Sequence, residues 1–125
     1  MSSSVESTYT SLIQQYLAVY CIENATFYAE RLVATRKTSH SVYLLGLCYY
    51  RQGKPQRTKA VLQYEHQSSN NPSPAMQYLL AKACLDLKDY GTAEEALLRQ
   101  ARAEYRSGQH QDMLDFILSA SVRRS

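Results

Sequence analysis

The sequence lacks the features that mark secreted, disulfide-bonded and membrane-spanning proteins. No apolar run approaches the roughly 18 residues that a membrane-spanning helix needs, and residues 1–6 lack the basic and apolar segments of a signal peptide. Its three cysteines, Cys21, Cys48 and Cys84, form no CxxC pair and fall in apolar helical contexts. We therefore expect a protein that is made and kept inside the cell, with reduced thiols in its core.

The chain also lacks a large excess of positive or negative charge. Fourteen Lys and Arg against eleven Asp and Glu leave a net charge of +3, whereas a nucleic-acid site needs basic residues gathered on one face. Arg51, Lys54, Arg57 and Lys59 do cluster around one expected turn, but a solvated helix junction explains them better. We expect no nucleic-acid partner.

No constellation of residues indicates chemistry. His40, His66 and His110 are far apart, and none pairs with a cysteine or carboxylate at the spacing of a metal site or a catalytic triad. We therefore predict that the protein is not an enzyme. We expect no catalytic residue, cofactor, metal, small-molecule substrate or membrane partner.

What the sequence does have is tyrosine. It contains eleven, with two phenylalanines and no tryptophan. A tyrosine offers a large, fairly rigid contact surface with a polar tip, which suits packing and protein interfaces more than catalysis.

Helical periodicity runs through almost every segment, and one pattern repeats. Residues 42–49 read V-x-x-L-G-x-x-Y, which is the first half of the tetratricopeptide signature with valine in place of tryptophan, and Thr58-x-x-x-Leu62 follows. The pair returns 35 residues later as Leu80-Ala81. An earlier copy has Leu12 33 residues before Leu45, and the small residue of its second helix, Ala25, is 33 residues before Thr58. These intervals bracket the roughly 34 residues of a tetratricopeptide repeat.

The repeat predicts an all-α superhelix of antiparallel helical hairpins, because one hairpin cannot bury its apolar face alone and its neighbours must stack. The residues expected to form the repeat-packing core are Leu12, Tyr16, Ala25, Ala29, Leu45, Gly46, Tyr49, Leu62, Leu80, Ala81, Cys84, Ala93 and Leu97.

We expect a single domain over residues 1–125, with repeats at about 6–38, 39–72 and 73–107 and a further helix at about 109–123. That last helix fits either half of a fourth repeat or a capping helix. We also expect the chain to be the N-terminal fragment of a longer protein.

A second apolar stripe accompanies the core stripe. Tyr43, Leu47 and Tyr50 share one face of a helix, and no charge occurs between residues 42 and 50. The first helix of each hairpin lines the concave face, so we expect an apolar groove that binds protein, or else tyrosines that pack on a terminus or loop of the same chain. The residues expected at the dimer or groove interface are Leu17, Tyr43, Leu47, Tyr50, Tyr78, Lys82 and Leu85.

Three strings in the chain, at residues 27–32, 44–54 and 77–87, resemble the N-terminal region of one family, the third subunit of the anaphase-promoting complex. The string Cys-Tyr-Tyr-Arg-x-Gly-Lys is much more specific than a general tetratricopeptide match. The resemblance implies a non-catalytic scaffold subunit of a ubiquitin ligase in cell-cycle control, present in nucleus and cytoplasm. It further implies that these repeats form a homodimer, in which each groove clasps the first helices of the other copy, and that the other subunits of the complex are partners.

Two further interpretations stay open. The chain could be a general tetratricopeptide adaptor with another protein partner, although a carboxylate-binding groove would need more cations than Lys82. Ser73-Pro74 is a minimal proline-directed phosphorylation pattern, but an ordinary loop between repeats explains it more simply.

Overall fold

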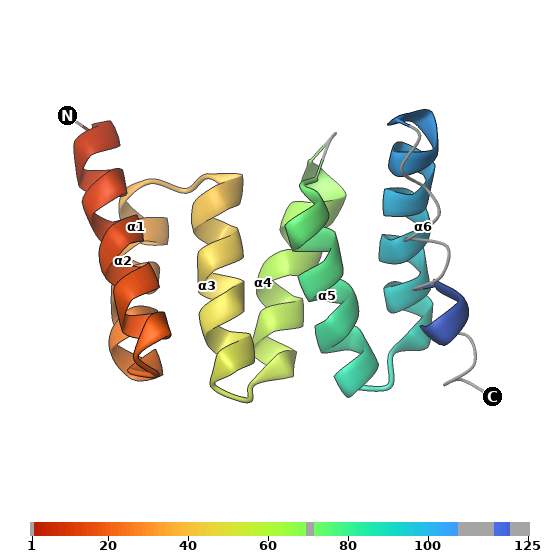
Figure 1. The fold of residues 1–125 in the computed structure, drawn as a ribbon, viewed down its shortest axis with the longest axis horizontal. Helices are drawn as coiled ribbons and strands as arrows, with labels where there is room; N and C mark the ends of the chain where they lie inside the picture. The colour runs from red at the N-terminus through yellow and green to blue at the C-terminus, as the bar shows by residue number, and fades with distance from the viewer. Residues whose placement is uncertain (1, 70–71, 108–116, 121–125) are drawn as a thin grey trace.

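The computed structural model describes residues 2–69, 72–107 and 117–120, and no strand occurs among them. Between residues 2 and 107 the described part of the chain forms six helices in succession (Figure 1). They are α1 (Ser2–Ala18), α2 (Ile22–Thr35), α3 (Ser39–Arg51), α4 (Pro55–Ser68), α5 (Pro74–Asp86) and α6 (Tyr90–Ser107).

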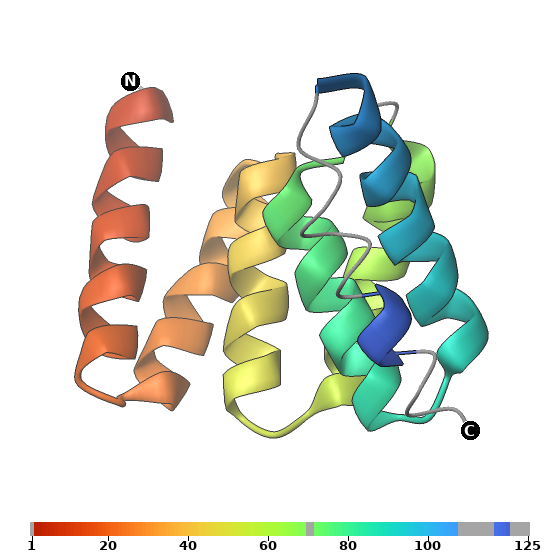
Figure 2. The ribbon, with the colours of Figure 1, turned by 45° about the vertical axis from the view of Figure 1, so that its right-hand side comes forward.

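The helices form three antiparallel hairpins that stack in chain order. Each helix packs on the next one, and α3 also contacts α5. Helices α1, α3 and α5 stand side by side along the front of Figure 1 with α2 and α4 behind them, and the turned view of Figure 2 shows the same order. The expected all-α tetratricopeptide superhelix is therefore confirmed.

Local sequence signals start the helices of the second and third hairpins. The Thr38 side chain accepts a hydrogen bond from the Ser41 N–H at the start of α3, and the Ser41 hydroxyl accepts one from the Thr38 N–H. This reciprocal pair is a capping box. The Ser73 hydroxyl accepts from the Met76 N–H at the start of α5, so this side chain has a structural role as a cap. Pro55 and Pro74 occupy the first turns of α4 and α5, where their missing N–H is harmless.

The three turns inside the hairpins have the same backbone conformation. Tyr20, Gly53 and Lys88 each have a φ between 62 and 76° and follow the last turn of α1, α3 and α5. In the α3–α4 turn the Gly53 N–H bonds to the Tyr50 carbonyl and the next N–H bonds to the Tyr49 carbonyl. The other two turns repeat this pattern, which is the Schellman ending of a helix.

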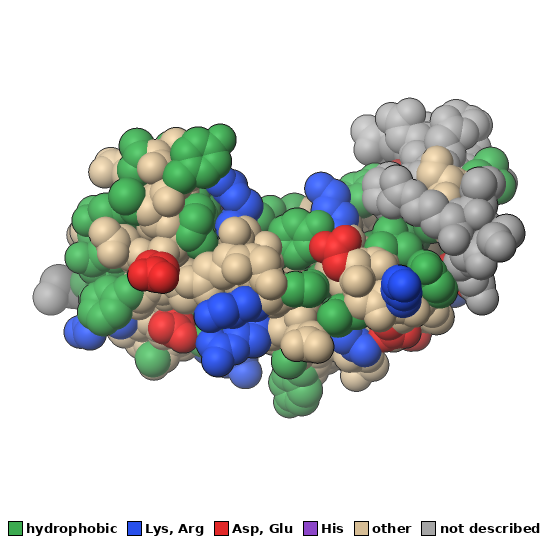
Figure 3. Space-filling view, turned by 90° about the horizontal axis from the view of Figure 1, so that it is seen from below, with side chains coloured by type: hydrophobic (Ala, Val, Ile, Leu, Met, Phe, Trp, Pro, Cys, Tyr) green, Lys and Arg blue, Asp and Glu red, His purple; other side chains and the backbone are tan. Residues whose placement is uncertain are grey.

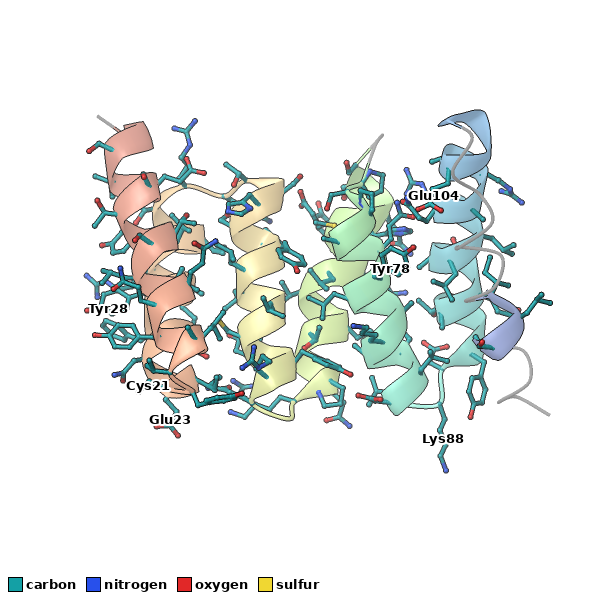
Figure 4. The ribbon with its side chains drawn as sticks, in the orientation of Figure 1. Cys21, Glu23, Tyr28, Tyr78, Lys88 and Glu104 are labelled. Atoms are coloured by element: carbon teal, nitrogen blue, oxygen red, sulfur yellow. The ribbon has the colours of Figure 1, made fainter. Side chains whose placement is uncertain are left out.

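Because a side chain is strained in this left-handed conformation, Lys88→Gly is expected to stabilise the fold by about 0.5–1 kcal/mol. The Lys88 side chain points into solvent from the α5–α6 turn (Figure 4), so no packing is lost with it. Gly53→Ala places the same strain into the equivalent turn and should cost about 1 kcal/mol. Urea unfolding of both variants tests the pair, and a destabilised Lys88→Gly protein would contradict the assignment of strain.

The core consists of two clusters of buried side chains, one centred on the first hairpin and α3, the other on α5, α6 and Leu62. Tyr43, Leu47 and Val61 contact both clusters, so the two form one continuous interior. Of the residues expected to form the repeat-packing core, the structure buries Ala25, Ala29, Leu45, Gly46, Tyr49, Leu62, Leu80, Ala81, Cys84, Ala93 and Leu97.

The other two of these residues, Leu12 and Tyr16, are half-buried, and Ile13 beside them is fully buried. The first hairpin has no described hairpin on its outer side. Tyr16 therefore covers the outer edge, where its ring stacks on Tyr28 with centroids 5.8 Å apart, and the interior contact falls to Ile13.

The expectation of core thiols is wrong for Cys21, which is exposed. It lies in the tight turn between α1 and α2 and precedes the first residue of α2, so its side chain faces solvent. Cys48 and Cys84 are buried, and burial raises the pKa of each thiol to about 11. Both stay protonated at neutral pH.

The further helix expected at 109–123 lies largely outside the described residues. Residues 117–120 are helical, and Ala120 is buried in the same cluster as Leu97. No helix in the described part of the chain is both long and apolar enough to span a bilayer.

Candidate protein-binding groove

The middle of the concave face is formed by α3. Tyr43, Leu47 and Tyr50 are each half-buried, so each packs on the core and still offers surface to a partner. Figure 3, viewed toward the hairpin turns, shows a hollow at the middle of the edge that α1, α3 and α5 form. Helix α3, the middle helix of this row, has no charged residue between positions 42 and 50.

The polar tip of Tyr50 is satisfied within the chain. Burial raises the pKa of its phenol, and a hydrogen bond with the Asp86 carboxylate raises it further. The phenol therefore stays neutral and donates to the carboxylate. This contact links α3 to α5 and leaves the aromatic ring as the part of Tyr50 that a partner can touch.

Helix α5 forms one wall of the groove. Tyr78 and Leu85 are half-buried and pack against the C-terminal core cluster, whereas Lys82 is exposed. Figure 4 places Tyr78 on the side of α5 that faces α6. Tyr78 thus lies on the side of α5 away from α3, although it was expected at the groove. Of the other two expected α5 residues, Leu85 is a half-buried apolar side chain and Lys82 is an exposed cation.

Helix α1 contributes differently from what its sequence suggested. Leu17, expected at the interface, has 7% of its surface exposed and lies in the core with Leu44 and Cys48. It is buried because α3 packs on the end of α1, where the Arg51 guanidinium donates to the Leu17 carbonyl at 3.5 Å. Leu17 therefore has little surface to offer a partner.

The rest of α1 near the groove is polar. A shallow hollow of about 470 Å³ is lined by Glu6, Ser7, Thr10, Ser11 and Gln14. The groove is thus apolar over α3, mixed over α5 and polar over α1. An asymmetric arrangement of this kind suits a partner with an apolar centre and a polar flank.

An aromatic cluster at the outer edge of the first hairpin was not anticipated from the sequence. The Tyr28 ring lies 6.0 Å from the Tyr9 ring and 5.3 Å from the Phe27 ring, and Phe27 is 52% exposed beneath the Arg31 guanidinium. Figure 4 shows Tyr28 at the N-terminal edge of the stack, pointing outward. The seven-residue spacing of Tyr9 and Tyr16 is the signal that could have predicted a tyrosine stripe on this edge.

The described side chains form no recognisable catalytic or metal centre. His40 is exposed and His66 is buried against Gln77, and no group of three or more His, Cys, Asp or Glu in the described residues could hold a metal ion.

The stack of tetratricopeptide hairpins defines the chain as a helical-repeat protein. The family model described as anaphase-promoting complex, cyclosome, subunit 3 matches residues 19–100. The chain belongs to this family, and the resemblance seen in the sequence is confirmed.

Curated relatives agree with this assignment. The chain is 36% identical over 85 residues to the cell division cycle protein 27 homologs of Homo sapiens and Mus musculus, which covers 68% of this chain and 10% of each relative. It is 34% identical over 111 residues to Protein bimA of Emericella nidulans, covering 87% of this chain and 13% of that protein. The chain thus spans about a tenth of the length of the curated relatives it matches.

Proposed function

We propose that this chain is the homodimerisation region of a non-catalytic scaffold subunit of the anaphase-promoting complex, a ubiquitin ligase of the cell cycle that acts in nucleus and cytoplasm. Membership of the subunit 3 family supports the complex and its other subunits as partners. The observation that carries the dimer is the uncharged, half-buried face of α3, formed by Tyr43, Leu47 and Tyr50.

A symmetric dimer makes the best use of such a small surface. Each buried aliphatic or aromatic anchor contributes roughly 1.5–3 kcal/mol, whereas association costs on the order of 4–15 kcal/mol before any net affinity appears. Three anchors used once contribute roughly 4.5–9 kcal/mol, which lies within the range of that cost and leaves little or no net affinity. A two-fold dimer uses the same face twice in a single association.

Tyr43→Glu and Leu47→Glu test the dimer directly. Each places a carboxylate on the uncharged face, where it would be desolvated without a partner. We expect the parent to be a dimer at micromolar concentration in sedimentation-velocity or light-scattering experiments, and each variant to dimerise about 30-fold more weakly.

Two matched variants control for the change in charge. Tyr64→Glu alters an exposed tyrosine on α4, and Leu98→Glu alters an exposed leucine on α6. Both should remain dimeric. Circular dichroism must show unchanged helix content, because Tyr43 and Leu47 also contact the core. A monomeric parent would overturn the dimer and leave a tetratricopeptide adaptor for another protein.

A further inference from the structure

Three of the four cations around the α3–α4 turn form no ion pair with the carboxylates of the described residues. Arg51, Lys54 and Arg57 are exposed, whereas the fourth cation, Lys59, is paired with Asp89. Figure 3, which looks onto the hairpin turns, shows Lys and Arg side chains gathered near this turn. The solvated junction expected from the sequence is therefore a patch of exposed positive charge.

Tyrosine rings hold the two arginines of this patch in place. The Arg51 guanidinium lies 5.6 Å from the centre of the Tyr20 ring and also donates to the Leu17 carbonyl at 3.5 Å. The Arg57 guanidinium lies 5.6 Å from the centre of the Tyr49 ring. A guanidinium that lies over a ring still presents N–H donors at its edge, and its planar group is preorganised for a carboxylate.

Tyr20 occupies an unusual position for an aromatic residue. It is 80% exposed and has a φ of 62°, a conformation in which glycine is the usual residue. Val19 beside it is 64% exposed. A strained residue with an exposed side chain points to a function for that side chain. Tyrosine and arginine are also the residue types enriched where protein interfaces concentrate their binding energy.

A hollow of about 370 Å³ adjoins the Tyr20 ring. Its lining residues are Tyr20, Cys21, Ile22, Glu23 and Asn24, and Figure 4 places Cys21 and Glu23 at the end of the first hairpin that carries the α1–α2 turn. The exposed ring and the half-buried Ile22 give the hollow apolar surface. The Glu23 carboxylate disfavours a second carboxylate there, so the hollow suits an apolar side chain.

Two glutamates limit what this surface can bind. Glu23 lines the hollow, and Glu30 accepts a hydrogen bond from the Tyr49 hydroxyl at 2.7 Å, which fixes the ring beneath Arg57. A nucleic-acid strand brings a continuous run of phosphates, which these glutamates would repel. A protein segment can instead place its carboxylates at the arginines and an apolar side chain at the hollow. The distribution of charge therefore favours an acidic protein segment.

We propose that the turn surface, formed by Tyr20, Arg51, Lys54 and Arg57, docks an acidic segment of a partner protein. Carboxylates of the segment pair with the guanidinium edges of Arg51 and Arg57, and a neighbouring apolar side chain packs on the exposed Tyr20 ring. The turn surface shares no residue with the α3 face proposed for the dimer. Docking therefore goes beyond the proposed dimer and does not require it.

A defined peptide probes the turn surface. In an acetylated and amidated heptapeptide, a central leucine is flanked on each side by three glutamates. In NMR titrations of the intact, isotope-labelled chain, we expect the amide signals of Tyr20 and Gly53 to shift while that of Leu47 stays in place. Replacing every glutamate of the peptide by glutamine should weaken binding at least tenfold, and replacing the leucine by glycine on the order of threefold.

Arg31 provides a matched control for Arg57. Its guanidinium lies 5.2 Å from the centre of the Phe27 ring, at the outer edge of the first hairpin. Arg57→Gln and Arg31→Gln therefore each remove one charge and one guanidinium that lies over a ring. We expect Arg57→Gln to weaken peptide binding on the order of tenfold and Arg31→Gln by less than threefold. Equal losses would show general charge attraction and overturn the proposal.

Tyr20→Gly separates binding from stability. Glycine relieves the left-handed strain, which offsets the lost contact with Arg51, so the midpoint of urea unfolding should not fall. Peptide binding should weaken on the order of tenfold, because the ring is gone from the turn surface. Lys88→Gly makes the same backbone change in the α5–α6 turn and should weaken binding by less than threefold. Unchanged binding by Tyr20→Gly would overturn the proposal.

Three other results would also overturn it. One is a shift of the Leu47 amide without any shift at Tyr20 and Gly53, which places the peptide in the groove. Another is a single-stranded oligothymidylate that shifts the Tyr20 and Gly53 amides and binds more tightly than the peptide, which assigns the turn surface to nucleic acid. The third is a peptide that does not bind at millimolar concentration.

Discussion

Leu62→Ala is expected to destabilise the fold by about 3–4 kcal/mol. Leu62 has no exposed surface and joins α4 to the core cluster that contains Val42, Leu80 and Leu97. Its removal leaves a cavity between two hairpins, because the surrounding helices can relax only in part. Urea unfolding followed by circular dichroism measures the loss, and Leu98→Ala, at a position 42% exposed, should cost less than about 1 kcal/mol.

Gly46 on α3 lies directly against the Leu62 side chain. A Cβ added at Gly46 would lie 2.9 Å from the Cγ and Cδ2 atoms of Leu62. In the parent, Gly46→Ala gains about 1 kcal/mol of helix propensity but suffers an overpacking cost of about 1–3 kcal/mol. We therefore expect no gain in stability, or a loss of about 1–2 kcal/mol.

In the Leu62→Ala background, the atoms that oppose the added methyl are gone. Gly46→Ala should then stabilise the protein by about 1 kcal/mol, so that its effect changes sign between the two backgrounds. A double-mutant cycle measures this coupling. Additive effects of the two substitutions would contradict the close contact between α3 and α4.

This contact also explains why so much of the fold could be predicted from the sequence. Gly46 and Leu62 belong to a repeated pattern of a small residue on one helix that receives a large one from the next. Such a pattern is local and periodic, so it is visible without a structure. The hairpins, their order and the face that carries Tyr43 and Leu47 follow from it.

The features that could not be predicted depend on tertiary contacts with neighbouring helices and on turn geometry. They do not depend on the periodicity of a single helix. Leu17 has the spacing of a groove residue, but the end of α1 is covered by α3. Cys21 has apolar neighbours in sequence, but it falls in a turn whose left-handed residue is Tyr20, where glycine would be the usual signal.

A buried polar network centred on Gln77 also depends on residues from several helices and could not be predicted from one helix alone. Gln77 is 2% exposed, and its Nε2 donates to the Pro72 carbonyl at 3.1 Å and to Gln100 Oε1 at 2.7 Å. These two acceptors fix the orientation of the amide, so its Oε1 faces His66 Nε2 at 3.4 Å. Gln100 in turn donates to Glu104 Oε1 at 3.0 Å.

Gln77→Leu is expected to destabilise the fold by about 3 kcal/mol or more. The substitution keeps the side-chain size but leaves polar groups of Pro72, Gln100 and His66 without their partner in a buried site, at about 1–3 kcal/mol each. Gln63→Leu on α4, at a half-buried position, changes the same residue types and should cost less than about 1 kcal/mol. Equal losses in the two variants would contradict a network in which Gln77 is central.

The same network predicts a pH dependence that separates it from simple packing. Burial lowers the pKa of His66 below its ordinary value of 6.5, and this outweighs the Gln77 hydrogen bond, which raises it. The nearby Arg99 guanidinium also lowers this pKa, and Glu95 opposes it. The folded chain therefore binds the proton less readily than the unfolded chain, so stability is full above pH 6.5 and falls as the pH drops below it.

His66→Gln tests this direction, because glutamine can offer an N–H toward Gln77 Oε1 and does not titrate. We expect the parent to lose stability between about pH 7 and pH 5.5, and the variant to lose less over the same range in urea titrations. The carboxylates of both proteins titrate mainly at lower pH, so the difference between the two curves isolates the imidazole. Identical slopes would mean that His66 is protonated as easily in the folded state as in the unfolded state, which burial beside Arg99 opposes.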